Sequence, residues 1–277
     1  MSIINVCIVF VFALLIVSIY SYDESEALRN VAISGLTYCS KTKIENKDSF
    51  HADAIPEVQI GKVWTNSSLL FYTAYDSLTD SIVLTVRGSD DIPNWIDNID
   101  AVKTSPYSDS SVKVHKGFYS EYLALRDPMV HALLSQYSLH PTTKLVLTGH
   151  SSGGANMVFF AYDLLVTKSI PELDFFHLSS LFTFGVPRVG NPAFASSFVS
   201  ADIPHTRVVH YRDIVPHLPY EWMGFKHTPH EIWYDSEDSS SYVECDGTGE
   251  DNNCSDQELY EWPSDHCYYI GQYICGC

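Results

Sequence analysis

A strand that runs into a glycine-rich turn and then into a helix constrains this chain more than any other feature. The apolar run at residues 144–148 is long enough for a buried strand, and Gly149-His150-Ser151-Ser152-Gly153 follows it directly. Residues 155–161 have the composition of a helix. A serine in G-x-S-x-G between a strand and a helix stands in a strained turn, with its hydroxyl above the sheet edge. The small neighbours leave room for that turn. The pattern therefore predicts that Ser151 is a nucleophile.

Strands and helices alternate along the rest of the chain. Further strands are expected at residues 69–75, 81–86, 181–186, 206–211 and 231–234, and helices at 24–38 and 118–134. Residues 40–61 are polar and predict irregular structure. Central strands without polar interruption favour a mainly parallel sheet with helices on both faces, which is an α/β fold. We expect one domain over residues 22–277, with a disulfide-stapled segment at its C-terminal end.

The first 21 residues predict a signal peptide. Residues 1–22 carry no charged side chain, and the apolar run within them is short for a membrane span. They contain no lysine or arginine, so an uncleaved anchor is the competing interpretation. The formal net charge of −18 makes nucleic acid a poor partner. The chain is therefore expected to be secreted, or to reside in a lysosome or another endomembrane lumen.

The cysteines and glycosylation sequons agree with export. Six cysteines remain after the predicted signal: Cys39, Cys245, Cys254, Cys267, Cys275 and Cys277. An even number in an oxidising compartment predicts three disulfides, although six cysteines allow about fifteen pairings. A zinc site is the competing interpretation, but no C-x-x-C or H-x-x-x-H spacing supports a metal. Asn66 and Asn253 begin acceptor sequons for glycosylation.

A serine nucleophile needs a histidine base and a carboxylate that orients it. In this architecture the order along the chain is serine, acid, histidine. Asp213 lies two residues beyond the strand predicted at 206–211, at a carboxyl edge where such folds place their sites, and is the best acid. His227 and His230 both precede the next strand, and spacing alone does not choose between them. His150, inside the turn, is interpreted as a packing or hydrogen-bonding residue.

An oxyanion hole and a lid are also predicted. The backbone N–H of Ser152 can supply one oxyanion donor, and the loop that follows the strand at 81–86 can supply the second. After that loop, Ile92, Trp95, Ile96 and Ile99 fall at helical spacing, so one face of a short helix is apolar. Such a helix can act as a lid over an apolar site. The alternative is an ordinary surface helix docked on the core.

Several motifs in order resemble the secreted fungal-type, or class 3, lipases of the α/β-hydrolase fold. They are Val86-Arg87-Gly88-Ser89, Asn94-Trp95-Ile96-Asp97-Asn98, His115-Lys116-Gly117-Phe118, residues 148–155, Thr183-Phe184-Gly185-Val186-Pro187-Arg188-Val189-Gly190-Asn191, and His210-Tyr211-Arg212-Asp213-Ile214-Val215-Pro216. The similarity extends from about residue 69 to the C-terminus. Two positions depart from the family pattern: Ser152 stands where leucine is frequent, and Asn156 where an apolar residue is usual.

The resemblance implies a role for each site residue. Ser151 would be the nucleophile, Asp213 the acid and His227 the base, since the family places this histidine four residues before a Glu-x-Trp like Glu231-Ile232-Trp233. Ser89 would give the first oxyanion contact. The lid would comprise residues 91–99: Asp91, Ile92, Trp95, Ile96 and Ile99 are its defining residues, with Trp95 as the apolar anchor. The resemblance also implies that Cys39 pairs with one of the last cysteines, and Cys245 with Cys254.

These observations predict a secreted serine carboxylester hydrolase and favour a triacylglycerol lipase that works through an acyl-enzyme. The reaction requires no cofactor or metal. Its partners would be an acylglycerol or other ester and a transient lipid–water interface, with no stable protein partner. One alternative is an esterase for soluble esters of the feruloyl type, because four acidic residues, Asp90, Asp91, Asp97 and Asp100, lie on the lid or directly beside it. The other is a catalytically silent lipid-binding protein.

Overall fold

The computed structural model describes residues 22–258 and 262–277, so the predicted signal peptide lies outside the described residues. Eight strands form the central sheet in the order β1-β2-β3-β6-β7-β8-β9-β10. The strands are β1 (Val58–Thr65), β2 (Leu70–Asp76), β3 (Ser81–Val86), β6 (Lys144–His150), β7 (His177–Phe184), β8 (His205–His210), β9 (Glu231–Tyr234) and β10 (Val243–Glu244). The run from β3 to β9 is parallel, and the outer pairs are antiparallel. The prediction of a mainly parallel sheet is confirmed.

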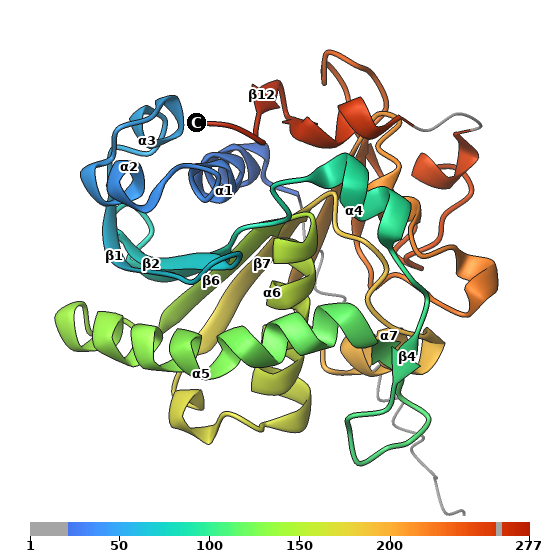
Figure 1. The fold of residues 1–277 in the computed structure, drawn as a ribbon, viewed down its shortest axis with the longest axis horizontal. Coiled ribbons are helices and arrows are strands. Elements are labelled where there is room, and N and C mark those ends of the chain that lie inside the picture. Colours follow the sequence, from blue (N-terminus) through green and yellow to red (C-terminus); the bar gives the residue numbers. More distant parts are fainter. Residues whose placement is uncertain (1–21, 259–261) are drawn as a thin grey trace, which may run out of the picture.

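Helices cover both faces of this sheet (Figure 1). The helices are α1 (Glu24–Leu36), α2 (Lys41–Asn46), α3 (Phe50–Asp53), α4 (Ile92–Asn98), α5 (Lys116–Leu139), α6 (Ser152–Tyr162) and α7 (Pro192–Ser200). Helix α1 lies on one face and begins at Asp23, whose side chain accepts hydrogen bonds from the N–H groups of Ser25 and Glu26. Helices α5 and α6 lie on the other face, and every residue of α6 is buried. Helix α6 packs on β6 and β7 with α5 beside it, and this leaves none of its residues exposed.

Residues 40–61 differ from the prediction of irregular structure, because they contain α2, α3 and the start of β1. Ser40 and Ser49 accept hydrogen bonds from Lys43 and Ala52 respectively, so each short helix has a serine cap. Most side chains of β1 are partly or fully exposed, as expected of the sheet's edge strand. An edge strand of this kind lacks the alternating apolar pattern that would reveal it in the sequence.

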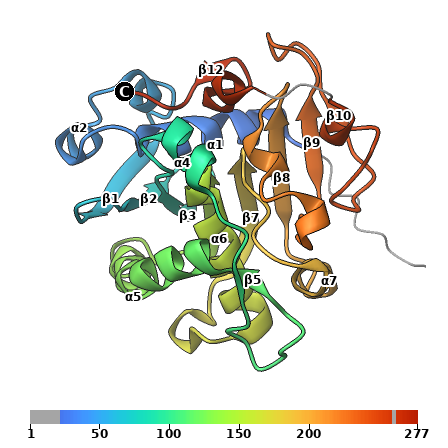
Figure 2. The same ribbon diagram turned by 45° about the vertical axis from the view of Figure 1, so that its right-hand side comes forward.

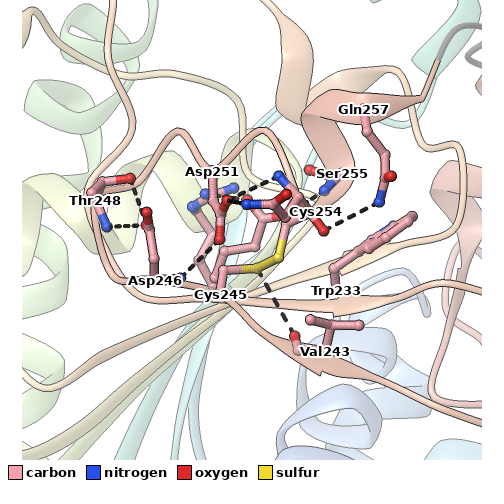
Figure 3. Close-up of a disulfide and its surroundings, with 12 residues drawn as sticks. Trp233, Val243, Cys245, Asp246, Thr248, Asp251, Cys254, Ser255 and Gln257 are labelled. Carbon is pink, nitrogen blue, oxygen red and sulfur yellow. Dashed lines mark hydrogen bonds and ion pairs between the residues drawn. A yellow bond between two sulfur atoms is a disulfide. The ribbon is translucent and has the colours of Figure 1, made fainter.

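Three disulfides tie down the C-terminal segment, as the sequence predicted. Cys39 pairs with Cys277, Cys245 with Cys254 and Cys267 with Cys275. The two pairings that the family resemblance implied are both present. Figure 3 shows the loop closed by Cys245 and Cys254, in which the side chain of Asp251 accepts hydrogen bonds from the N–H groups of Asp246 and Asn253. Aspartate turns and the disulfide thus order this loop together.

The C-terminal segment ends in a small hairpin of β11 (Tyr268–Tyr269) and β12 (Gln272–Tyr273). The remaining short strands, β4 (Lys103–Thr104) and β5 (Val114–His115), pair with each other before α5. Among the helices of the described residues, none is long and apolar enough to span a bilayer.

Candidate active site

The turn between β6 and α6 holds Ser151 in a strained conformation. Its backbone has φ +58° and ψ −134°, a region that serine rarely adopts. The N–H of Ser151 donates to the carbonyl oxygen of Phe184 at 2.9 Å. A Cβ atom at Gly149 would lie 2.7 Å from the carbonyl group of Gly153, and one at Gly153 would overlap the carbonyl oxygen of Val86. The glycines are therefore required by close backbone approach, as the sequence predicted.

Asp213 lies in the loop after β8, fully buried. Its Oδ1 accepts a hydrogen bond from the N–H of Val215 at 2.8 Å, and its Oδ2 contacts Nδ1 of His266 at 2.7 Å and accepts a hydrogen bond from the hydroxyl of Tyr269. Burial alone would raise the pKa of Asp213, but the imidazole of His266 and the three hydrogen bonds lower it. Asp213 is thus held as a carboxylate next to a histidine.

The prediction that His227 contacts Asp213 is wrong. The Nε2 atom of His227 lies 2.6 Å from the carbonyl oxygen of Pro216, and its backbone N–H donates to Glu250. His227 is therefore committed to holding the loop that follows Asp213. The Glu-x-Trp that pointed to it has a structural role as well, because Glu231 forms an ion pair with Arg207 at 2.6 Å.

His230 does not meet Asp213 either. Its backbone N–H donates to the carbonyl oxygen of His205, the first residue of β8, and its side chain is exposed. In a parallel sheet, residues just before one strand lie near the amino ends of its neighbours, whereas Asp213 follows the carboxyl end of β8. A histidine immediately before β9 is thus at the wrong edge of the sheet.

His266 occupies the place that the sequence analysis assigned to His227. It is fully buried and lies in the short helical turn Pro263–Cys267 of the disulfide-stapled segment. Sequence reasoning missed it, although it also follows Ser151 and Asp213 in chain order. The usable signal was its place among the last three cysteines, since Cys267–Cys275 closes a loop within this segment and Cys39–Cys277 ties the segment to the domain. Tyr269, the second contact of Asp213, comes from the same segment.

Ser151, Asp213 and His266 converge at the end of β7. Phe184, the last residue of β7, accepts the hydrogen bond from Ser151 N–H, and a Cβ at the next residue, Gly185, would lie 2.7 Å from both Asp213 Oδ2 and His266 Cε1. The hydroxyl of Ser151 and the Nε2 of His266 are both buried, and neither has a hydrogen-bond partner within the described residues. Buried polar atoms normally have partners, so these two are poised to act on something else.

His150 supports this arrangement from inside the turn. Its Nδ1 lies 2.6 Å from the hydroxyl of Tyr38, and its Nε2 lies 2.8 Å from the backbone oxygen of His266. Burial lowers the pKa of His150 well below the usual value, so the ring is neutral. The prediction of a hydrogen-bonding role is confirmed. The residue before the nucleophile thereby holds the backbone of His266.

Of the two predicted oxyanion residues, Ser152 follows Ser151 directly, and Ser89 follows a glycine that lies against Ser151. Ser152 begins α6, so its N–H belongs to the first turn of the helix, where backbone donors have no partner within the helix. Ser89 is half-buried, and the segment before it passes against the nucleophile, since a Cβ at Gly88 would lie 2.8 Å from Cβ of Ser151. A donor pair beside the hydroxyl is what a tetrahedral oxyanion needs.

Helix α4 forms where the sequence predicted a lid helix. Its N-cap is Asp91, whose side chain accepts a hydrogen bond from the N–H of Asn94. Trp95 stacks on Phe118 of α5 at 5.8 Å between ring centroids, and Ile92 is buried. Figure 2 shows α4 beyond the carboxyl end of the sheet strands, above α6.

An apolar pocket of about 220 Å³ lies between α4 and the loop after Asp213. Ile96, Ile99, Ile214, Leu218, Tyr220 and Met223 are among its lining residues. The apolar face of α4 therefore points both to α5 and to the loop that carries the acid, while Ser151 has no exposed surface.

Buried histidines predict that the protein loses stability in acid. Burial lowers the pKa of His150, His205 and His227 well below 6.5. Because these folded pKa values are depressed, the unfolded chain binds more protons below about pH 6.5, and stability that is complete above this value is lost as the pH falls. Each histidine contributes up to about 1.4 kcal/mol per pH unit. Urea unfolding at about pH 7.5, 6.5 and 5.5 should show a falling midpoint; a constant midpoint would contradict the burial argument.

A nucleophile turn on a parallel sheet, with a buried acid–histidine pair after later strands, defines a serine hydrolase of the α/β-hydrolase fold. Residues 83–223 match the model of the family described as lipase (class 3). The lipase of Rhizomucor miehei is 35% identical over 259 residues, which cover 91% of this chain and 69% of that protein. The chain belongs to the class 3 lipase family.

Solved structures agree with this assignment. The triacylglyceride lipase of Rhizomucor miehei superposes with a TM-score of 0.80 at 34% identity, covering 91% of this chain and 96% of that one. A triacylglycerol lipase whose catalytic centre is described as a serine protease triad superposes with a TM-score of 0.79 at 34% identity, over 91% of this chain and 97% of that one.

Proposed function

We propose that this protein hydrolyses acylglycerol esters, with Ser151 as nucleophile, His266 as base and Asp213 as the residue that orients His266. The observation that carries the proposal is the buried 2.7 Å contact between Asp213 Oδ2 and His266 Nδ1, close to a strained serine whose hydroxyl has no hydrogen-bond partner in the described part of the chain. The related triacylglycerol lipases support the choice of substrate class.

The reaction proceeds in two halves. Ser151 Oγ attacks the ester carbonyl and passes its proton to His266 Nε2, while the developing oxyanion is stabilised by the N–H of Ser152 and by Ser89. His266 then protonates the leaving alcohol, and the acyl group stays on Ser151. Water, deprotonated by His266, attacks the acyl-enzyme and releases the fatty acid. Asp213 stabilises the imidazolium form in both halves.

The surroundings of the site support a substrate that arrives from a lipid surface. Ser151 is inaccessible with α4 in its present position, and the apolar face of α4 would become exposed if the helix moved away. Tyr220, which lines the apolar pocket next to α4, stacks on Trp222, and Trp222 is 78% exposed. Exposed aromatic rings are suited to a water–lipid boundary. We therefore propose that residues 91–99 act as a lid that opens at such a boundary.

Secretion and glycosylation are part of the same proposal. Three disulfides agree with an oxidising compartment. The acceptor residues Asn66 and Asn253 are both exposed. The resulting enzyme would meet its substrate outside the cell or in an endomembrane lumen.

The proposed function is tested by measuring hydrolysis of tributyrin below and above its solubility limit. A lidded lipase should show a rise in rate of about tenfold or more once droplets form, because the interface favours the open lid. A rate that follows substrate concentration smoothly through the limit would point to a soluble esterase. A protein that turns over neither ester, and is not labelled by a fluorophosphonate at Ser151, would contradict hydrolase function altogether.

A further inference from the structure

A buried asparagine behind the nucleophile joins a carboxyl group to the oxyanion region. Asn156 of α6 is fully buried, and its Nδ2 donates to the carbonyl oxygen of Ser152 at 2.8 Å and to Oε1 of Glu121 at 2.7 Å. Both partners are acceptors, so the orientation of the amide is fixed. Its own Oδ1 is buried without a partner in the described residues. An apolar residue would avoid that cost, so packing alone does not account for Asn156.

The effect of Asn156 is to fix the carboxyl group of Glu121. Burial raises the pKa of Glu121, and the hydrogen bond from Asn156 opposes this in part. That hydrogen bond occupies Oε1. The side chain of Glu121 makes no other hydrogen bond or ion pair within residues 22–258 and 262–277. A carboxylate can accept about four hydrogen bonds, so most of its capacity remains open.

Glu121 faces a pocket of about 400 Å³ between α4 and α5, which it shares with the proposed oxyanion residue Ser89. The walls combine Trp95, Ile99 and Phe118 with polar groups of the lid. No lysine or arginine lines this pocket, whereas Asp91, Asp100 and Glu121 all do. The other polar side chains of the lining are Asn94, Asn98 and His115, and burial lowers the pKa of His115. A group that enters beside Ser89 therefore meets carboxyl acceptors next to an apolar wall, and no lysine or arginine to pair with an anion.

This chemistry favours one kind of substrate. A hydroxyl group near the scissile ester can donate to Glu121, and the attached carbons can contact Phe118. Both residues belong to α5 and not to the lid that must move to admit the substrate. A phosphate in the same place would face the carboxyl group of Glu121 with no lysine or arginine to pair with it, which is unfavourable at this short range. A fully acylated or plain alkyl alcohol would leave the carboxylate of Glu121 unpaired.

We propose that Glu121 is a specificity-determining residue that favours esters with a free hydroxyl on the alcohol, such as partial acylglycerols, over plain alkyl and phosphate-bearing esters. The proposal rests on the acylglycerol hydrolysis proposed above and names the residue that selects among such esters. Asn156 acts through Glu121, as a positioning residue.

The test compares two soluble esters that differ only in hydroxyl groups, glycerol monobutyrate and propyl butyrate. The measured quantity is the ratio of their kcat/KM values, because a change in overall activity cancels from it. Glu121→Leu removes the acceptor and should lower the ratio about tenfold, the effect of one hydrogen bond to a charged group. Glu121→Gln keeps one acceptor oxygen and should lower the ratio less. Asp127→Asn, an exposed acid on the same helix, is the matched control and should leave it unchanged.

A third ester separates selection from a structural role. In both Glu121 variants, kcat/KM for the butyryl ester of glycerol phosphate should rise relative to kcat/KM for propyl butyrate, because a repelling charge is removed. Equal losses for all three esters would mean that Glu121 merely supports Ser152, and would overturn the proposal. If Glu121→Leu does not fold, the same ratios are measured with Glu121→Gln. Labelling of Ser151 by a fluorophosphonate shows whether the active site of each variant is intact. Wild-type protein inactive on every ester would instead contradict the proposed function.

Discussion

Replacement of His266 by alanine is expected to lower kcat for ester hydrolysis by at least about 10⁴-fold, because Ser151 then has no base to take its proton. Asp213 would remain buried, with Tyr269 and the N–H of Val215 as its partners. The fold should therefore survive, and KM should change much less than kcat. The measurement is steady-state hydrolysis of a soluble butyrate ester, alongside a urea unfolding curve.

His227→Gln is the matched control for that experiment. His227 is buried like His266, and the family resemblance seen in the sequence implied that it is the base. In the structure it bonds to the carbonyl oxygen of Pro216, so its loss should cost about 1–2 kcal/mol of stability while kcat stays within about tenfold of the wild-type value. If instead His227→Gln abolished turnover and His266→Ala did not, the assignment of the base would be reversed.

Removal of the Cys39–Cys277 disulfide is expected to cause the largest loss of stability. This bond joins residues 238 positions apart, and the chain-entropy model gives about 5 kcal/mol for a closed loop of that length. It also ties the end of the segment carrying His266 and Tyr269 to the residues that follow α1. The double variant Cys39→Ser with Cys277→Ser should therefore unfold at much lower urea concentration and lose activity at temperatures where the rest of the domain is still folded.

Cys245→Ser with Cys254→Ser provides the comparison. That pair closes a separation of only 9 residues, for which the same model gives about 2.5 kcal/mol. Its loop also keeps the hydrogen bonds of Asp251 when the sulfurs are gone. Urea unfolding of both double variants under identical non-reducing conditions shows which of the two loses more stability. A greater loss of stability for the short loop would show that loop length is not the dominant factor.

Local sequence patterns specified most of the sheet and the nucleophile. The strands Ser81–Val86 and Glu231–Tyr234 were predicted with their observed bounds, and the turn at Ser151 has the backbone strain that its glycines implied. Asp213 was found because it follows a strand in a parallel sheet, where position along the chain fixes the edge on which a residue lies. These features depend on periodicity and on short-range sterics, which a sequence displays directly.

The choice of histidine was decided by tertiary structure. His227 and His266 both satisfy the order of serine, acid and base, and the Glu-x-Trp favoured the wrong one because Glu231 serves an ion pair with Arg207. His266 reaches Asp213 because the C-terminal segment, which Cys39–Cys277 ties to the residues after α1, crosses the carboxyl edge of the sheet. Contacts between residues this far apart in the chain leave no periodic signal. Eleven consecutive residues, from Lys144 to Gly154, were enough to predict that Ser151 is the nucleophile. Which histidine serves as its base was decided by the way in which the last part of the chain folds back over the sheet.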